Sequence, residues 1–433
     1  MLNIKRASQQ FQPALERVLA RYRPLEPVRA AELISRVVAL NPAECEATLQ
    51  QTLDQFAHRH RHLNQTFLRH FEQVSPLLPA DCPPESLSPA QKQLIGAYFT
   101  MEYAIEAAAF FNPSLVLAPD QTGLQTGSQS EQLRVIFSFR AVGEGHISSL
   151  VFRSALLENG ELFSDPLGPY VDPPESIQMV YPEPSLKQDL DQGYELRFSP
   201  DTALSERVIF PMLEHECNGI EDARFVRFCH SDGSHSYYAT YTAYDGRAIL
   251  PRLLHTQDFV RFHSFGLRGA GAVNKNLALF PRQIKGRYAM LSRIDGVNNY
   301  IMFSDSLTDW EAPQLLQTPR EVWEFGNIGN CGSPLETPAG WLVITHGVGP
   351  MRQYALGAIL LDLNDPCRLI ARLREPLMLP LAHEREGYVP NVVYACGGLL
   401  HGDQVHIAYG MADRFGGLAT VSLSELLAKM SDE

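Results

Sequence analysis

The stretch Ser236-Tyr-Tyr-Ala-Thr-Tyr-Thr242, followed by Ala-Tyr-Asp-Gly246, decides the fold because its pattern returns along the chain. It is rich in residues that favour β-strands, it ends in a polar side chain, and a turn follows at Asp-Gly. The same pattern recurs at residues 134–140, 287–293, 341–346 and 405–410. Repetition of one pattern predicts a fold built from similar units.

Each of these strands belongs to a larger unit. Most are preceded by another short strand and a hairpin, and most are followed by a third strand. The later units recur at roughly fifty to sixty residues, which is the spacing of four-stranded propeller blades. A β-sandwich shows the same strand alternation, but the recurrence of one hairpin pattern favours a propeller. We therefore predict a mainly β fold, a five-bladed β-propeller.

Two regions do not follow the repeat. Residues 163–208 are rich in proline, and we expect a long crossover between the first two units. The first hundred residues have apolar side chains at helical spacing, at residues 11–19 and 31–38 for example. Asn41 and Pro42 resemble a helix start, and we expect that helix to run to about residue 74. A further helix is expected from about residue 88 to residue 110.

The predicted organisation is thus an α-helical N-terminal extension over residues 1–111 and a propeller domain over residues 112–433. His58 and His62 have the i, i+4 spacing that a metal could use on a helix. No Cys or carboxylate is placed to complete such a site, and Arg59 and Arg61 interleave with the histidines. A solvated polar helix face is therefore the expectation, without a metal.

Composition limits the class of protein. The net charge of −13 argues against nucleic acid as the main partner. The first residues lack the apolar core of a signal peptide, and no apolar run approaches the length of a membrane span. The seven cysteines form no C-x-x-C pair and are expected to be reduced. We expect a cytoplasmic protein that binds neither nucleic acid nor a membrane.

The segment at residues 214–228 carries the strongest sign of chemistry. Glu221, Asp222 and Arg224 stand at the start of a short apolar run. This places two carboxylates and a cation at the beginning of a strand, where neighbouring charges can set the protonation state of an acid. The alternative is that Asp222 and Arg224 form a structural salt bridge on a turn.

If the strand ends converge at one end of a propeller channel, several polar residues meet there. One or two acids would then lie among cations and hydroxyls, which suits a polar neutral substrate together with a small anion. Each residue also has a structural reading: Arg293 could pair with Asp295, and His346 could bond to backbone. The residues are Arg140, Asp222, Arg224, Lys275, Asn276, Arg293, His346, Arg352, Tyr354, Asp413 and Arg414.

Six stretches, in the same order, resemble motifs of glycoside hydrolase family 130, the mannoside phosphorylases and mannosidases. They are residues 219–224 (Gly-Ile-Glu-Asp-Ala-Arg), 275–281, 329–334, 340–347, 354–362 and 388–393. The likeness covers residues from about 112 to the C-terminus and leaves out the helical region. It implies a five-bladed β-propeller and inverting chemistry at a β-mannosidic bond.

The resemblance also implies roles for individual residues. Asp222 matches the general acid, which in this family is thought to act through a sugar hydroxyl. Other positions match phosphate-binding residues, namely Lys275, Arg293, His346 and Tyr354. Positions expected to bind the substrate are Asn112, Arg140, Glu221, Arg224, Asn276 and Asp413.

The expected activity is phosphorolysis of β-1,2- or β-1,4-linked manno-oligosaccharides, which releases α-mannose 1-phosphate. Inorganic phosphate is the co-substrate, and no cofactor is expected. A hydrolase would need a carboxylate base to activate water, and Glu384 or Glu386 are the candidates. A non-catalytic sugar-binding propeller and a scaffold for protein partners also remain open. The N-terminal helices suggest a homo-oligomer.

Overall fold

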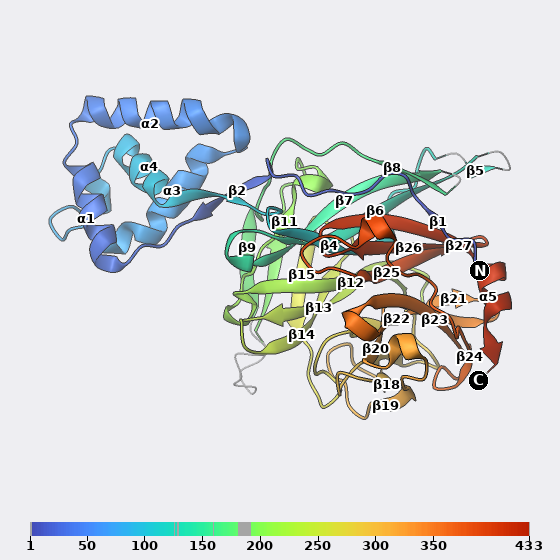
Figure 1. Ribbon diagram of the computed structural model, residues 1–433. Helices are drawn as coiled ribbons and strands as arrows, with labels where there is room; N and C mark the ends of the chain where they lie inside the picture. The colour runs from blue at the N-terminus through green and yellow to red at the C-terminus, as the bar shows by residue number, and fades with distance from the viewer. Residues whose placement is uncertain (1, 125, 128–129, 159, 181–191, 433) are drawn as a thin grey trace. The chain divides into compact units, whose positions relative to one another are not determined.

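The computed structural model describes residues 2–124, 126–127, 130–158, 160–180 and 192–432 (Figure 1). The chain forms two compact units. The first comprises Met1–Pro13, Glu106–Leu167 and Pro173–Glu433, and the second comprises Ala14–Ile105 and Gly168–Asp172. These units do not follow the predicted boundary at residue 111, since the first thirteen residues belong with the β-rich unit.

The second unit contains four α-helices and a small sheet. The helices are α1 (Pro27–Val38), α2 (Pro42–Phe56), α3 (Leu63–Val74) and α4 (Pro89–Tyr98). Asn41 caps α2 as predicted, because its side chain accepts a hydrogen bond from the Glu44 amide at 2.9 Å. Strand β2 (Val18–Tyr22) pairs antiparallel with β3 (Thr100–Ala104).

The prediction of a helix over residues 11–19 was wrong. Pro13 interrupts that run, since proline cannot donate the hydrogen bond that a helix interior needs. Val18 and Leu19 instead lie buried in β2. The helix expected to run to residue 110 ends at Tyr98, where the chain turns into β3.

The single helix predicted from residue 42 to residue 74 is also broken. A 3₁₀ turn at Ala57–Arg59 follows α2, and His60 then adopts an extended backbone. The His60 ring bonds the Glu102 carboxylate at 2.9 Å, which holds the break in place. His58 and His62 therefore do not share one helix face. Within the described ranges, no three His, Cys, Asp or Glu side chains gather in a metal-binding arrangement.

The first unit is built from antiparallel strands, as the repeat predicted. Its largest sheet has twelve strands: β4 (Ala109–Leu117), β5 (Thr126–Gly127), β6 (Ser130–Val142), β7 (Ser148–Glu158), β8 (Glu161–Ser164), β9 (Ser176–Val180), β10 (Gly193–Arg197), β11 (Val208–Ile209), β12 (Gly219–Cys229), β13 (His235–Tyr244), β14 (Ile249–Thr256) and β15 (Arg261–Gly266). It consists of two antiparallel groups that meet where Gly219 of β12 pairs in parallel with Ser148 of β7.

Three further sheets complete the unit. The first contains β16 (Ala278–Leu279), β17 (Tyr288–Ser292), β18 (Asn299–Ser304) and β19 (Gln314–Gln317). The next contains β20 (Asn327–Asn330), β21 (Leu335–Thr337), β22 (Gly340–Val348), β23 (Tyr354–Leu361), β24 (Leu369–Arg372) and β28 (Ser431–Asp432). The last contains β25 (Val393–His401), β26 (Gln404–Met411), β27 (Phe415–Ser422) and β1 (Lys5–Arg6).

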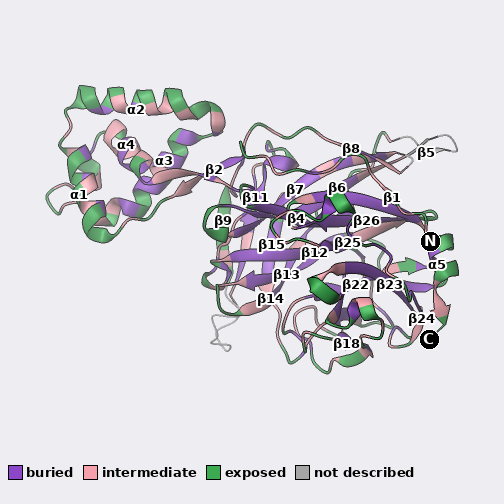
Figure 2. Cartoon of the chain, in the orientation of Figure 1, coloured by how far each residue is buried: buried purple, intermediate pink, exposed green. Residues whose placement is uncertain are grey.

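The five stretches that define the sequence repeat all lie in comparable strands. They fall in β6, β13, β17, β22 and β26, each flanked by antiparallel neighbours. These strands are largely buried, as the purple ribbons of Figure 2 show. Buried apolar residues of this unit form clusters. Phe152, Phe225 and Phe262 of the largest sheet lie in one cluster, and Ile344, Leu356 and Ile407, from two other sheets, lie in another.

The proline-rich stretch at residues 163–208 is not a simple crossover. Strands β9 and β10 pair antiparallel with each other, and β10 continues the sheet beside β15. Residues 181–191 of the predicted crossover, including Pro182 and Pro184, lie outside the described part of the chain. A short helix, α5 (Leu423–Lys429), follows β27. None of the described helices is long and apolar enough to cross a bilayer.

Candidate active site

A cavity of about 200 Å³ in the first unit gathers most of the predicted site residues. All of them except Glu221 and Arg224 line it, and Arg352 lines it as well. The lining residues are Phe111, Asn112, Arg140, Asp222, Lys275, Asn276, Arg293, His346, Arg352, Tyr354, Val389, Val392, Tyr394 and Asp413. The structure therefore brings together side chains from more than 300 residues of sequence.

The backbone around the cavity is unusual. Positive φ angles, which non-glycine residues rarely adopt, occur at five lining positions: Asn112 (50°), Asp222 (51°), Asn276 (70°), Arg352 (55°) and Asp413 (53°). Strained backbone of this kind persists where surrounding structure holds it, and it concentrates at functional sites. Its clustering here supports the assignment of the cavity as the site.

A β-bulge in β12 determines where the two adjacent carboxylates point. In a regular strand, Glu221 and Asp222 would face opposite sides of the sheet. The pairing register with β13 shifts between Glu221 and Arg224, and Asp222 sits at the irregularity. As a result, both carboxylates reach Arg140: its Nη2 donates to Glu221 Oε1 at 2.5 Å, and its Nη1 lies 3.5 Å from Asp222 Oδ1.

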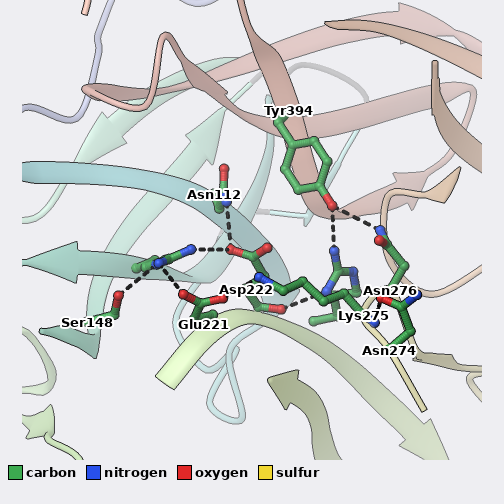
Figure 3. Close-up of polar contacts among 10 residues, drawn as sticks. Asn112, Ser148, Glu221, Asp222, Asn274, Lys275, Asn276 and Tyr394 are labelled. Atoms are coloured by element: carbon green, nitrogen blue, oxygen red, sulfur yellow. Dashed lines mark hydrogen bonds and ion pairs between the residues drawn. The ribbon is translucent and has the colours of Figure 1, made fainter. Parts of the chain in front are cut away.

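Asp222 is held by an amide and by cations (Figure 3). Asn112 Nδ2 donates to its Oδ1 at 2.6 Å. Arg224 Nη1 donates to the Asp222 backbone oxygen at 2.9 Å, not to the carboxylate, so the alternative of a simple Asp222–Arg224 salt bridge was wrong. Burial raises the pKa of Asp222, but Arg140, Arg224 and Lys275 together with the Asn112 bond outweigh it and hold the pKa below its usual value. Asp222 is therefore a carboxylate in the free protein at neutral pH.

Glu221 lies outside the cavity lining and connects two of its cations. It is buried, and it accepts hydrogen bonds from Arg140 and from Lys275 Nζ, the latter at 2.6 Å. Lys275 thus already forms an ion pair with Glu221 in the free protein. Ser148 Oγ accepts from Arg140 Nε at 2.8 Å and fixes the other side of that guanidinium.

Arg293 and Arg352 differ from Lys275 because neither forms an ion pair with a described carboxylate. Arg293 Nη1 donates only to the Asn327 side chain at 3.2 Å, and its buried Nε has no hydrogen-bond partner among the described residues. Asp295, the suggested partner of Arg293, instead accepts from Tyr300 and from the backbone amides of its own turn. Two guanidinium groups on one small cavity, neither in an ion pair with a described carboxylate, are an arrangement that can hold an anion.

His346 lines the same cavity but adds no positive charge to it. Its side chain is 1% exposed, and burial together with Arg293 and Arg224 holds its pKa far below its usual value. The ring stacks on Tyr354 at a centroid distance of 5.9 Å and packs against Tyr394 at 4.9 Å. His346 is therefore neutral in the free protein near neutral pH.

Asp413 is the second carboxylate of the cavity. Burial and the negative charge of Asp222 raise its pKa to about 7, against the opposing effect of Arg140 and Arg352. Near neutral pH the cavity thus holds one ionised carboxylate, Asp222, and one that titrates, Asp413.

Comparison with known proteins identifies the family. A family model described as beta-1,4-mannooligosaccharide phosphorylase matches residues 189–432, more than half of the chain. The chain belongs to glycoside hydrolase family 130. A 1,2-beta-oligomannan phosphorylase of Thermoanaerobacter sp. (strain X514) is 36% identical over 235 residues, covering 52% of this chain and 75% of the relative. A beta-1,2-mannobiose phosphorylase of Listeria innocua is 31% identical over 232 residues, 52% of this chain and 64% of the relative.

The fold is similar to solved family 130 structures. The structure of beta-1,2-mannobiose phosphorylase from Listeria innocua with beta-1,2-mannobiose superposes with a TM-score of 0.50. The match covers 76% of this chain and 92% of the other, at 23% identity.

The family 130 motifs did not point to every residue of the cavity. Phe111 and Tyr394 line it but were not predicted, and Val389 and Val392 form an apolar wall. Tyr394 directly follows the motif at residues 388–393, and this position could have indicated it. It was not predicted because it lies within an apolar strand. The ring of Phe111 lies under the Arg140 guanidinium, 5.1 Å from its centre, and belongs to a run of buried residues.

The candidate bases of a family 130 hydrolase lie elsewhere. Glu384 is buried and accepts hydrogen bonds from Tyr409 Oη at 2.7 Å and from Arg6 Nε at 2.9 Å. Glu386 is exposed, and neither carboxylate lines the cavity. Arg414, another predicted channel residue, lies over the ring of Phe415 and does not line it either.

Proposed function

We propose that this family 130 protein is an inverting β-mannoside phosphorylase. It cleaves β-1,2- or β-1,4-linked manno-oligosaccharides with inorganic phosphate and releases α-mannose 1-phosphate. The observation that carries the proposal is that Arg293 and Arg352, neither of which forms an ion pair with a carboxylate of the described residues, line the same cavity as Asp222. The phosphorylase names of the two sequence relatives support it.

The chemistry requires an acid on one side of the sugar and a nucleophile on the other. Phosphate arrives as an anion, so it needs no strong base; it needs a cationic site that places it at the anomeric carbon. Arg293 and Arg352 supply that charge, with Tyr354 and neutral His346 as hydrogen-bonding partners and Lys275 at the edge. No cofactor enters this reaction.

Asp222 acts as the general acid in this proposal, through a hydroxyl of the bound sugar. In the free protein its pKa is low because cations surround it. Phosphate would add negative charge to the same cavity and oppose those cations, which raises the pKa of Asp222 and favours its protonated form. Binding of the second reactant would therefore prepare the acid.

The remaining polar groups suit a sugar. Asn112 Oδ1 is buried without a hydrogen-bond partner among the described residues, so it can accept from a sugar hydroxyl. Asp413 and Arg140 add an acid and a fixed donor on the same cavity. Glu221 fixes Arg140 and Arg224 fixes the backbone of Asp222 through the contacts described above, and Asn276 lines the same cavity.

A hydrolase with Glu384 or Glu386 as base has no support from this geometry. Glu384 is used in structural hydrogen bonds, and neither glutamate reaches the cavity. A water nucleophile would also leave the charges of Arg293 and Arg352 without a function.

We also propose the finer features of the fold. Five antiparallel groups contribute cavity residues: Asn112 in β4, Asp222 in β12, Asn276 before β16, His346 in β22 and Tyr394 in β25. This convergence supports a five-bladed propeller. A homo-oligomer formed through the helical unit is also proposed. A cytoplasmic location remains part of the proposal.

The deciding experiment is product analysis of β-1,2- and β-1,4-mannobiose incubated with the protein, with and without inorganic phosphate. The expected product is mannose 1-phosphate, formed only when phosphate is present. Free mannose formed at the same rate without phosphate would exclude phosphorolysis. Binding without turnover would indicate a non-catalytic sugar-binding protein.

A further inference from the structure

We infer that the hydroxyl group of Tyr394 donates a hydrogen bond to an oxygen of the anionic reactant, and that it is a further anion-binding residue of the cavity. The inference rests on the proposed function for the identity of the anion, inorganic phosphate. It adds a neutral donor to Arg293 and Arg352, and it concerns a residue that the sequence motifs did not indicate.

The hydrogen-bond partners of Tyr394 are both donors. Arg224 Nη2 donates to Tyr394 Oη at 2.8 Å, and Asn276 Nδ2 donates to the same oxygen at 2.9 Å. A guanidinium group has no acceptor atom, so the direction of the first bond is certain. Figure 3 shows the hydroxyl of Tyr394 pointing toward Asn276 and the groups around Asp222.

The direction of the second bond is fixed by Asn330. Asn276 Nδ2 also donates to the Asn330 backbone oxygen at 3.0 Å, and a carbonyl oxygen can only accept. In return, Asn330 Nδ2 donates to the Asn276 backbone oxygen at 2.6 Å. The amide nitrogen of Asn276 must therefore face Tyr394, and the hydroxyl oxygen receives two hydrogen bonds.

A phenol oxygen has two acceptor positions and one hydrogen. Because Arg224 and Asn276 occupy the acceptor positions, the hydrogen of Tyr394 is left for a third direction. Among the described residues, no acceptor is bonded to that hydrogen. Tyr394 lines the cavity, so a ligand there can accept it. Burial and the charge of Asp222 also raise the pKa of this phenol, which keeps the hydrogen in place at working pH.

The surroundings of Tyr394 favour an anion as the acceptor. Its ring packs against His346 and lies 6.1 Å from Tyr354, both on the anion-binding side of the cavity. Arg224, which holds the hydroxyl, forms no ion pair with a described carboxylate and has a buried Nε without a partner. Phosphate oxygens are strong acceptors that would complete this arrangement.

The test is calorimetric binding of inorganic phosphate to the full chain and to Tyr394→Phe, in the absence of a mannoside. The variant keeps the ring and its contacts with His346 and removes only the hydroxyl. A hydrogen bond to a charged group corresponds to roughly a 10- to 100-fold change in affinity. We expect the affinity of the variant for phosphate to fall by this factor. Its affinity for β-mannobiose in phosphate-free buffer should change by less than about threefold, well below the tenfold that corresponds to 1.4 kcal/mol.

A matched control is Tyr409→Phe. Tyr409 is a buried tyrosine of the same unit whose hydroxyl donates to Glu384 and which does not line the cavity. This variant measures the cost of removing any buried phenol hydroxyl, and its affinity for phosphate should equal that of the parent protein.

The outcomes separate the two proposals. Equal phosphate affinity in Tyr394→Phe and the parent protein would overturn the role of the hydroxyl, and so would an equal loss of phosphate and mannobiose binding, which indicates a structural role alone. A parent protein that binds no phosphate would overturn both proposals. Selective weakening of phosphate binding in a protein that releases free mannose without phosphate would retain the anion-binding role and reject phosphorolysis.

Discussion

Asp222 and Asp413 show, at the scale of single residues, how one cavity can hold two carboxylates in different states. Asp222 has three cations and an amide donor acting on it, which favour the charged form. Asp413 has fewer such neighbours and feels the charge of Asp222, so its proton is retained to about pH 7. The environment assigns different chemistry to two identical side chains.

The replacement Asp222→Asn tests the acid directly. Loss of a general acid costs roughly 100- to 10,000-fold in rate, and we expect kcat for phosphorolysis to fall within or beyond that range. Sugar binding should persist because an amide retains similar size and polarity. Steady-state kinetics and calorimetry measure the two effects. Asp232→Asn, in an exposed turn, is the control and should leave kcat unchanged.

Asp413 gives a prediction about stability and pH. Its folded-state pKa of about 7 lies above the unfolded value, so the folded protein binds the extra proton below pH 7. The free energy of unfolding should therefore fall as pH rises toward 7 and level off above it. Asp413→Asn cannot titrate and should not show this fall. The free energy of unfolding of the parent should therefore drop by roughly 2 to 3 kcal/mol more than that of the variant between pH 5 and pH 8. Urea denaturation at both values measures it, and a pH-independent difference would contradict the assignment.

At the scale of the strand, the bulge in β12 is the feature that brings the carboxylates of Glu221 and Asp222 together. It places Glu221 and Asp222 on the same arginine, which a regular strand cannot do. Glu221 then pairs with both Arg140 and Lys275 and does not line the cavity. The bulge thus positions a charge that limits how strongly the cations act on Asp222.

Glu221→Gln tests this strand-level role. Without the Glu221 charge, Arg140 and Lys275 would depress the pKa of Asp222 further, and the acid would lose its proton at lower pH. The basic limb of the kcat profile should therefore move to lower pH. Phosphate affinity should rise or stay the same because Lys275 loses its anionic partner. A profile that moves to higher pH would refute this account. Glu336→Gln, which breaks the surface pair with Arg282, is the matched control.

At the scale of the whole molecule, residues near the two ends of the sequence share one sheet. Strand β1 pairs with β27, with Lys5 opposite Thr420 and Arg6 opposite Ala419. Phe11 continues this contact, since it bonds Gly416 and packs against Phe137 at 4.7 Å. The short N-terminal segment is therefore a structural part of the β-rich unit.

Phe11→Ala tests that contribution. Phe11 is 6% exposed, and removing a buried phenylalanine ring costs about 3 to 5 kcal/mol. We expect a loss of that size in the free energy of unfolding of the β-rich unit, measured by denaturant titration. Leu15→Ala, at a position 63% exposed, is the control and should change stability by less than about 0.5 kcal/mol. An equal effect of both substitutions would show that the Phe11 contacts do not stabilise the sheet.

Much of this arrangement could be predicted from the sequence, and the limits have physical causes. The strand repeat and the motif order identified the β fold and most of the cavity, because polar residues at strand ends leave a visible pattern. The pairing of β1 and the hydrogen bonds of the Tyr394 hydroxyl depend on contacts between residues far apart in the chain. Such contacts leave no pattern in the sequence. The charge of His346 depends on burial, and the break after α2 depends on the bond from His60 to Glu102, so neither followed from residue type.

The pairing of β1 with β27 also has a consequence for synthesis of the chain. Lys5 and Arg6 are synthesised more than four hundred residues before their partners Thr420 and Ala419. At 5 to 20 residues per second, the first strand waits roughly 20 to 80 seconds for its partner. Phe11 stays without its Gly416 partner for nearly as long. Closure of the last sheet is therefore a late event in biogenesis, when the earlier sheets have had time to form.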